Sequence, residues 1–371
     1  MRIIFLALFV GLGFLTSAFG TEQTIRLAIF DNPQPDPSRV ETSQELETSY
    51  ERGIITALHV ANSMGFNIEE KTFFHGSSLL GILQQVSSVK QWSPDVIVGL
   101  NGSNEFFMSK TFFNDILVLS LSATDSQLKT LPKSFYSLGI PDPYVVNAII
   151  KFINQHNPGA NLFITVAAES KEGVDFSNLL SQKYKEQHSS AQVIQRKFLT
   201  DNMNMLDMKT FMSGYQKGDV IIVMAAGYYS AIDLMNKIAG YLPNNPIFLT
   251  SSDNWGNHAT PQIMKGRYTA FRMDTLTGSK DKSSYKLFND NYKKIYHAVP
   301  QDAISFVTYQ AIMSFVTALK QFPPPASLSM RDAILWSYQA ALKKNPDWFR
   351  PPGYVVYELK NNQETYFETI P

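Results

Sequence analysis

The stretch Pro94–Asp125, PDVIVGLNGSNEFFMSKTFFNDILVLSLSATD, decides the fold of this chain. It contains two short apolar runs, Val96–Val98 and Ile116–Leu119, which are rich in β-branched residues and too short for helices. Near-continuous apolar runs of this kind are typical of buried parallel strands. Each run is followed by small polar residues, GLNGSN at 99–104 and SLSATD at 120–125.

These two polar loops predict a ligand site. In an open α/β sheet, small ligands bind just past the carboxyl ends of the strands. Loops that offer hydroxyls and backbone N–H groups ahead of helices suit an anion such as a carboxylate. Neither loop has the residues of a catalytic base or a metal site, so the pattern indicates binding rather than catalysis.

Strand and helix patterns alternate through the first part of the chain. Strands are expected over Ile25–Phe30 and Ile68–Phe74, and the proline-containing segment Asp31–Ser43 is expected to be irregular. The apolar spacing predicts helices over Leu46–Ala61, Leu79–Val86 and Glu105–Phe113. Such alternation implies βαβ units and a mostly parallel sheet.

A second alternating series follows Pro141-Asp142-Pro143, where we place a crossing between two lobes. Its expected elements are a helix over 144–155, strand 162–167, helix 174–184, strand 192–199, helix 205–215, strand 219–224, helix 230–240 and strand 246–250. Beyond Arg272, the pattern predicts helices over 285–296 and 302–321, a third opened by a capping box at Ser329, and a hairpin over 354–370.

The predicted fold class is therefore α/β, with two doubly wound, Rossmann-like lobes. The first lobe is expected over residues 21–139 plus 271–349. The second lobe is expected over residues 140–270 plus 350–371, with boundary errors of a few residues.

The N-terminus has the pattern of a signal peptide. Arg2 precedes an apolar run, Ile3–Leu15, and small residues follow at Ala18 and Gly20. The run is too short to span a bilayer, and no later stretch is apolar for the required length. We expect cleavage after Gly20, no membrane span in the mature chain, and export to a bacterial periplasm.

Composition excludes several other classes. The 371 residues have zero formal net charge and 17% charged residues, which gives no case for nucleic acid or an anionic membrane surface as a partner. There are no cysteines, so neither disulfides nor a cysteine-linked lipid is available. The six histidines are scattered, and no GxSxG, Walker A or GxGxxG motif occurs, so no metal and no cofactor is expected.

The order of elements and several local motifs resemble the type I periplasmic binding proteins, especially the leucine/isoleucine/valine- and amide-binding receptors of ABC importers. Leu119–Asp125 is similar to the family's I-S-x-x-A-T segment, and Asp95–Gly99 resembles its third strand. Glu51-Arg52-Gly53 resembles the start of its first helix. Phe135–Ser137 with the following Asp142, and Gly353–Tyr357, resemble two of its crossings between lobes. The resemblance covers essentially the whole mature chain.

The resemblance implies two lobes, joined by three crossings, that close on a ligand between them. The positions matching the family's binding residues are Ser103, Ser122, Ala123, Thr124, Tyr228 and Asp253. It assigns the carboxylate of an amino-acid ligand to the first four, including the backbone N–H groups of Ala123 and Thr124. It assigns a cleft contact to Tyr228 and the ligand ammonium to Asp253.

Each of these residues also has an ordinary structural role. Ser103, Ser122 and Thr124 suit the N-caps of following helices, and capping is compatible with ligand binding. Asp253 suits a turn, and Tyr228 suits helix packing. The chain departs from the family at Glu172, where an aromatic residue is usual, and this departure favours a polar or charged ligand over an aliphatic one.

We therefore expect a solute-binding receptor, not an enzyme, with an ABC permease as its partner. A sensor of the same fold, acting on a membrane kinase or a chemoreceptor, is the alternative. An exported enzyme would need a nucleophile–base pair in the cleft, and the sequence offers no candidate pair.

Overall fold

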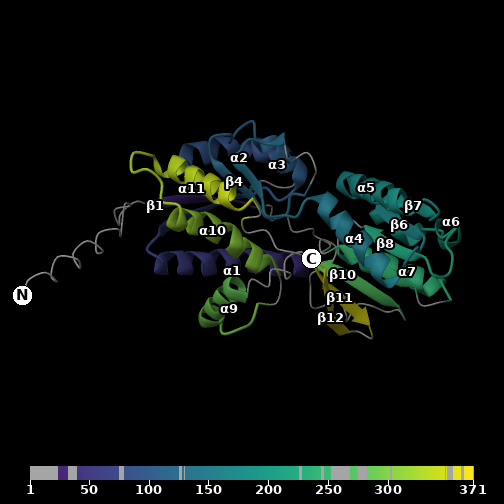
Figure 1. Ribbon diagram of the computed structural model, residues 1–371. Coiled ribbons are helices and arrows are strands. Elements are labelled where there is room, and N and C mark those ends of the chain that lie inside the picture. The colour runs from purple at the N-terminus through teal and green to yellow at the C-terminus, as the bar shows by residue number, and fades with distance from the viewer. Residues whose placement is uncertain are drawn as a thin grey trace, which may run out of the picture. The chain divides into compact units, whose positions relative to one another are not determined.

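The computed structural model describes residues 24–31, 40–74, 79–124, 128, 130–224, 228–243, 246–251, 268–274, 282–300, 303–346, 348, 354–360 and 363–370. The chain divides into two compact units (Figure 1). Unit 1 takes its described residues from Met1–Leu121, Leu131–Tyr136 and Thr308–Phe349. Unit 2 takes them from Ser122–Thr130, Ser137–Val307 and Arg350–Pro371.

Unit 1 is built on a five-stranded sheet, sheet A, with the strand order β2-β1-β3-β4-β5. Its strands are β1 (Thr24–Asp31), β2 (Asn67–Phe74), β3 (Val96–Gly99), β4 (Leu117–Ser120) and β5 (Phe135–Ser137). Its helices are α1 (Val40–Ser63), α2 (Leu79–Trp92), α3 (Ser103–Ser109), α11 (Met330–Lys344) and most of α10 (Ala303–Gln321). The pairs β1–β2, β1–β3 and β3–β4 are parallel. This is a doubly wound order with a switch point between β1 and β3.

Unit 2 is built on a seven-stranded sheet, sheet B, with the order β12-β11-β10-β9-β8-β6-β7. Its strands are β6 (Leu162–Ala167), β7 (Val193–Phe198), β8 (Val220–Met224), β9 (Ile247–Ser251), β10 (Thr269–Asp274), β11 (Tyr354–Lys360) and β12 (Gln363–Ile370). Its helices include α4 (Asp142–His156), α5 (Lys171–Gln187), α6 (Met208–Phe211), α7 (Tyr228–Tyr241) and α9 (Lys282–Tyr296). The parallel strands β7-β6-β8-β9-β10 repeat the doubly wound order of sheet A, and β11 and β12 extend the sheet antiparallel. The predicted α/β class with two doubly wound sheets is confirmed.

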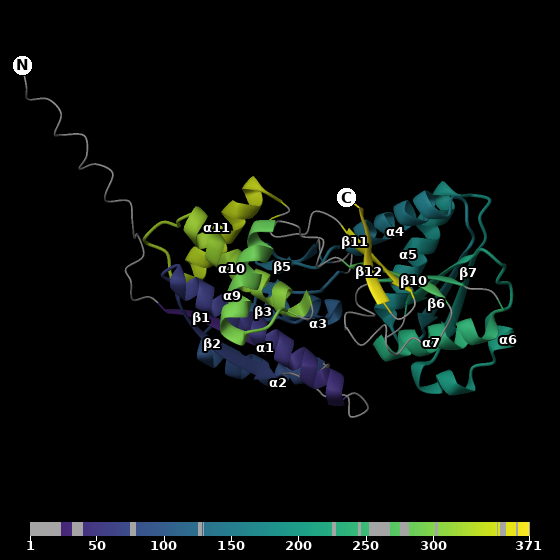
Figure 2. The same cartoon turned by 90° about the horizontal axis from the view of Figure 1, so that it is seen from below.

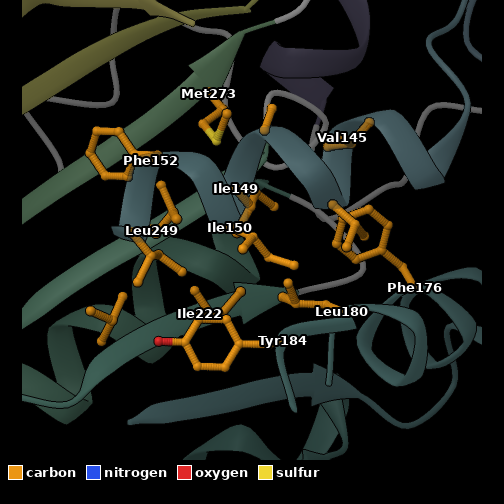
Figure 3. Packing of buried hydrophobic residues seen from close by; sticks show 14 of the residues in the cluster. Val145, Ile149, Ile150, Phe152, Phe176, Leu180, Tyr184, Ile222, Leu249 and Met273 are labelled. Atoms are coloured by element: carbon orange, nitrogen blue, oxygen red, sulfur yellow. The ribbon is translucent and has the colours of Figure 1, made fainter. Parts of the chain in front are cut away.

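The two faces of sheet B are covered by different helices (Figure 2). On one face, α4 and α5 bury a cluster that includes Ile150, Leu180, Ile222 and Leu249. Figure 3 shows the side chains of α4 pointing onto the sheet, with Tyr184 of α5 beside Ile222. The other face packs against α7. Central strands such as β6 and β8 are buried on both faces, which explains their continuous apolar sequences.

Most predicted elements are present, but the expected helix over 205–215 is wrong. A 3₁₀ helix over Thr200–Met205 and the single turn α6 replace it. Asp207 interrupts the pattern, because its carboxylate accepts the Lys209 backbone N–H and the Thr210 hydroxyl and so starts a new turn. The apolar residues that suggested a long helix, Phe211 among them, are buried against sheet B from this short segment.

Several other helices differ in length from the expectation; α2, for example, continues to Trp92 instead of ending at Val86. The first helix begins at Val40, inside the segment that the prolines led us to treat as irregular through Ser43. The helix expected over Glu105–Phe113 ends at Ser109.

The division into units differs from the predicted lobe boundaries. β10 pairs with both β9 and β11, and unit 2 continues through Val307, whereas the prediction returns the chain to the first lobe after Ala270. The described residues of 122–130 and 137–139 also belong to unit 2, although the prediction places them in the first lobe.

Ser329 is the N-cap of α11, as predicted. The Ser329 Oγ accepts the Asp332 backbone N–H over 3.2 Å and donates to the Asp332 Oδ2 over 2.6 Å.

We expect Ser329→Ala to lower the free energy of unfolding by about 0.5–2 kcal/mol, because the first turn of α11 loses this acceptor. Urea unfolding measures the change. Ser327→Ala, at an exposed position two residues earlier, is the control and should stay within about 0.5 kcal/mol of the parent. Equal losses in both variants would contradict the capping role.

Candidate functional site

The loop after β3 turns sharply against the end of β1. Gly99 has φ +126°, and a Cβ at this position would lie 1.9 Å from the Phe30 carbonyl oxygen. The next residue, Leu100, has φ +57° and is fully buried. A left-handed conformation is unusual for a bulky residue and costs about 1–2 kcal/mol. The chain therefore accepts strain at the switch point of sheet A, where doubly wound folds bind ligands.

Two hydrogen bonds connect this loop to the loop after β4. The Ser120 Oγ donates to the Leu100 carbonyl oxygen over 3.2 Å, and the Leu121 backbone N–H donates to the Asn101 Oδ1 over 3.2 Å. The two polar loops predicted from the sequence thus lie side by side and are held together. The roles of Leu100, Asn101 and Ser120 were not predicted, because short polar residues in a loop do not reveal which partner each one bonds.

Ser103 is buried and is the first residue of α3. The N-cap is Gly102, whose carbonyl accepts the Phe106 N–H and which has no side chain to complete a cap. The expectation that Ser103 caps this helix is therefore wrong, and its assignment as a ligand contact stays a prediction.

The segment Ser122–Thr124 belongs to unit 2 and is fixed by the chain around the start of α4. The Ser137 hydroxyl donates to the Ala123 carbonyl, and the Asp142 backbone N–H donates to the Thr124 carbonyl over 3.0 Å. Ser122 is exposed, Ala123 is buried and Thr124 is half-buried. The structure thus places three of the four predicted carboxylate-binding residues together, while Ser103 lies in unit 1.

Tyr354, at the start of β11, belongs to the same neighbourhood in unit 2. Its ring lies in the buried cluster that contains Ile140 and Val145, which flank Asp142. Its buried hydroxyl has no hydrogen-bond partner among the described residues. Burial, and more weakly the Asp142 carboxylate, raises the pKa of Tyr354, so the phenol stays protonated at neutral pH.

A row of residues with buried polar members crosses sheet B just below the carboxyl ends of its parallel strands. Thr165, Val223, Thr250, Arg272 and Tyr357 are in register on β6, β8, β9, β10 and β11. The Arg272 side chain is only 7% exposed, and its guanidinium carbon lies 4.6 Å from the centre of the Tyr357 ring. Sequence reasoning missed this arginine, although it is the one charged residue of the run TAFRM at the start of β10.

The loop after β6 ends in a regular helix start. The Ser170 Oγ accepts the Gly173 backbone N–H over 3.0 Å and caps α5. Glu172 is exposed in the first turn of that helix, where the helix dipole favours a carboxylate. The residue that departs from the family pattern therefore sits on a solvated turn.

The two remaining predicted contacts are described only in part or not at all. Tyr228 is the first residue of α7, and its side chain lies outside the described residues. Asp253 lies wholly outside them.

Two further properties concern the described part of the chain. No group of three or more His, Cys, Asp or Glu side chains within it is arranged to hold a metal ion. Within the same residues, every helix is too short or too polar to cross a membrane.

The chain is similar over most of its length to solved structures of transporter receptors. The leucine-binding protein LivK from Thermotoga maritima matches with a TM-score of 0.71 at 17% identity, over 93% of this chain and 98% of that one. LivJ from Streptococcus pneumoniae, solved with isoleucine, matches with a TM-score of 0.71 at 14% identity, over 94% and 99%. A solute-binding protein from Rhodopseudomonas palustris, solved with benzoate, matches with a TM-score of 0.70 at 11% identity, over 94% and 96%.

The fold is that of the type I periplasmic binding proteins. Coverage of nearly the full length of both chains means that the type I fold accounts for both units, not for one sheet alone. At these low sequence identities, the structural similarity establishes the fold and nothing beyond it. No protein-family model matches the sequence, and no curated protein matches it.

The turn at Gly99 can be tested by substitution. Gly99→Ala should destabilise unit 1 by about 1–2 kcal/mol for the left-handed conformation and by a further 1–3 kcal/mol, roughly, for the clash with Phe30. Gly218→Ala is the matched control, because Gly218 has φ +102° and a Cβ there would meet no atom within 4 Å. The Gly218→Ala variant should be destabilised only by the cost of the left-handed conformation. Equal unfolding free energies for the two variants, measured in urea, would show that the close approach to Phe30 is unimportant.

Proposed function

We propose that this chain is a solute-binding receptor that captures a small polar ligand, an amino acid or a related compound, between two lobes for an ABC importer. The observation that supports it most directly is the joined pair of polar loops at the switch point of sheet A. These loops present hydroxyl and amide groups at the edge where doubly wound sheets bind ligands. Because they are already fixed by the fold, little conformational entropy is lost on binding.

The ligands of the structural neighbours support a carboxylate. Isoleucine and benzoate, bound by the Streptococcus pneumoniae and Rhodopseudomonas palustris proteins, differ in size and in the amino group but share a carboxylate. Neutral hydroxyl and N–H donors suit this group, because hydrogen bonds to a charged acceptor are stronger than neutral ones.

Within this proposal, Ser103, Ser122, Thr124 and the backbone of Ala123 bind the ligand carboxylate. Tyr228 packs against the ligand, and Asp253 meets its ammonium. The exposed Glu172 in place of an aromatic residue favours a polar ligand. The N-terminal pattern supports export by a cleaved signal peptide of about 20 residues, and the proposed place of work is the periplasm, with a permease as partner.

A thermal-shift screen of the chain from Thr21 tests the receptor function. The probes are leucine, isoleucine, valine, glutamate, glutamine, succinate, benzoate and the uncharged benzamide. A ligand at a hundredfold above its dissociation constant adds about 2.7 kcal/mol of stability, which raises the melting temperature measurably. We expect at least one carboxylate to stabilise the protein and benzamide to have no effect. Stabilisation by none of the probes would contradict the proposal.

Two substitutions test the division of roles between ligand groups. Asp253→Asn should weaken binding of an amino acid by about 3–5 kcal/mol, because a buried ammonium loses its counter-charge. Thr124→Val should cost less, about 1–3 kcal/mol, because it removes one hydrogen bond to a charged acceptor. Calorimetric titration measures both, and Ser327→Ala is the control. An Asp253→Asn variant that binds as tightly as the parent would contradict the proposal that Asp253 meets the ligand ammonium. It would leave the proposed carboxylate contacts untouched.

A further inference from the structure

β7 is the last strand at one end of sheet B, and its backbone has an open side. The Phe198 carbonyl accepts the Ala168 N–H, at the end of β6, over 2.8 Å. Because alternate residues of a strand bond to the same neighbour, Val193, Gln195 and Lys197 turn their backbone N–H and C=O groups away from β6. Among the described residues, these three N–H groups have no hydrogen-bond partner. The Gln195 carbonyl has one long contact, 3.3 Å from a nitrogen of the neighbouring arginine side chain.

Edge strands usually carry features that prevent them from pairing with other chains. β2, at an edge of sheet A, has the exposed charges Glu69, Glu70 and Lys71 in succession. β7 instead runs in register with β6 over all six residues, without proline, glycine or a bulge. The half-buried Arg196 donates to two backbone carbonyls of unit 2, which leaves Lys197 as the one exposed charge of β7. β7 is therefore poorly protected against pairing with another strand.

A polar groove of about 390 Å³ lies between this open edge and α5. Its lining residues are Asn178, Ser181, Gln182, Lys185, Val193 and Gln195. α5 connects β6 to β7 and packs on both strands (Figure 1). The groove thus lies where a further helix would pack if sheet B were extended by further strands.

We propose that α5 and β7 form a dimer interface, and that the occupant of the groove is a second copy of this chain. A two-fold axis perpendicular to sheet B pairs the two β7 strands antiparallel about Gln195 and places both α5 helices on the same face. The outward N–H and C=O groups of each strand then bond to those of the other. The inference goes beyond the proposed receptor function and does not depend on it, because none of the proposed ligand contacts belongs to α5 or β7.

The spacing of the two helices agrees with this arrangement. Each α5 packs on β6 and β7 of its own copy, and neighbouring strands lie about 4.8 Å apart. The axes of the two α5 helices are therefore about two strand spacings, or roughly 10 Å, apart. Packed helices are typically separated by about 8–10 Å. The α5 of the second copy thus fits beside the first and fills the groove.

The charges of α5 are complementary to those of an antiparallel copy. Asp175, Asn178, Gln182 and Lys185 are exposed and spaced by three or four residues, so they form one row along the helix. Antiparallel pairing about the middle of this row brings Asp175 of each copy to Lys185 of the other. Lys171, one turn before Asp175, lies opposite a position beyond the end of the second α5. The same row therefore supplies both members of two opposite-charge pairs, as a two-fold interface requires.

Sedimentation velocity of the chain from Thr21 tests for the dimer at about 1–100 μM, because interfaces of ordinary size can be as weak as micromolar. We expect a monomer–dimer equilibrium in this range. Asp175→Lys and Lys185→Asp should each weaken self-association by roughly tenfold or more, because each places like charges opposite one another twice. An equal mixture of these two variants should associate at least as tightly as the parent, because every pair across the interface then has opposite charges.

Gln195→Pro tests the strand edge separately. The N–H that this substitution removes points away from β6, and proline is tolerated at such positions of edge strands. The monomer should therefore keep its fold, whereas dimerisation should weaken by roughly tenfold or more, because the centre of the strand pair loses its donors. Lys151→Asp, at an exposed lysine of α4, is the control and should associate like the parent.

Three outcomes would overturn the proposal. The first is a parent chain that stays monomeric over the whole concentration range. The second is a dimer that neither charge variant weakens, because another surface would then hold the copies together. The third is a mixture of the two charge variants that associates no better than each variant alone. If Gln195→Pro does not fold, the mixing experiment decides the question, since both charge variants change only exposed side chains.

Discussion

The close approach of Gly99 to the Phe30 carbonyl is the constraint on which the site of unit 1 depends. β1 and β3 are neighbours in sheet A, and Gly99 at the end of β3 lies against the backbone of Phe30 in β1. The chain that leaves β3 must therefore turn sharply at Gly99 itself. Only glycine fits there, and the left-handed Leu100 that follows completes the turn. Burial of the Leu100 side chain and the hydrogen bond from Ser120 offset the conformational cost. The strained turn, which costs about 1–2 kcal/mol, thereby fixes the position of the polar loops.

The shared topology explains why, in both units, the polar residues described above lie near the carboxyl ends of the parallel strands. Parallel strands joined by crossover helices place all their carboxyl ends together, and sheets A and B share a doubly wound strand order. Topology therefore sets where a ligand would bind. The residues near the two edges differ: a hydroxyl and an amide hold the loops of sheet A together, whereas buried threonines and an arginine stacked on Tyr357 lie near the edge of sheet B.

Much of the fold was predictable because buried parallel strands appear in the sequence as short runs of apolar, often β-branched residues, as in Val96–Gly99 and Leu117–Ser120. The loops were predictable for the same reason, since they follow those runs directly. Three features were not. The left-handed conformation of Leu100 runs against the preferences of its residue type. The spacing over 205–215 fits a helix, but Asp207 and packing on sheet B override it. The burial of Arg272 depends on pairing with β11, a strand far along the chain.

The polar loops of sheet A also limit how a receptor of this kind could discriminate among ligands. Hydroxyls and backbone N–H groups donate hydrogen bonds to many carboxylates about equally well, because the same group occurs in all amino acids and simple acids. In the proposed receptor these loops would therefore select for a carboxylate, and discrimination between side chains would have to come from other residues.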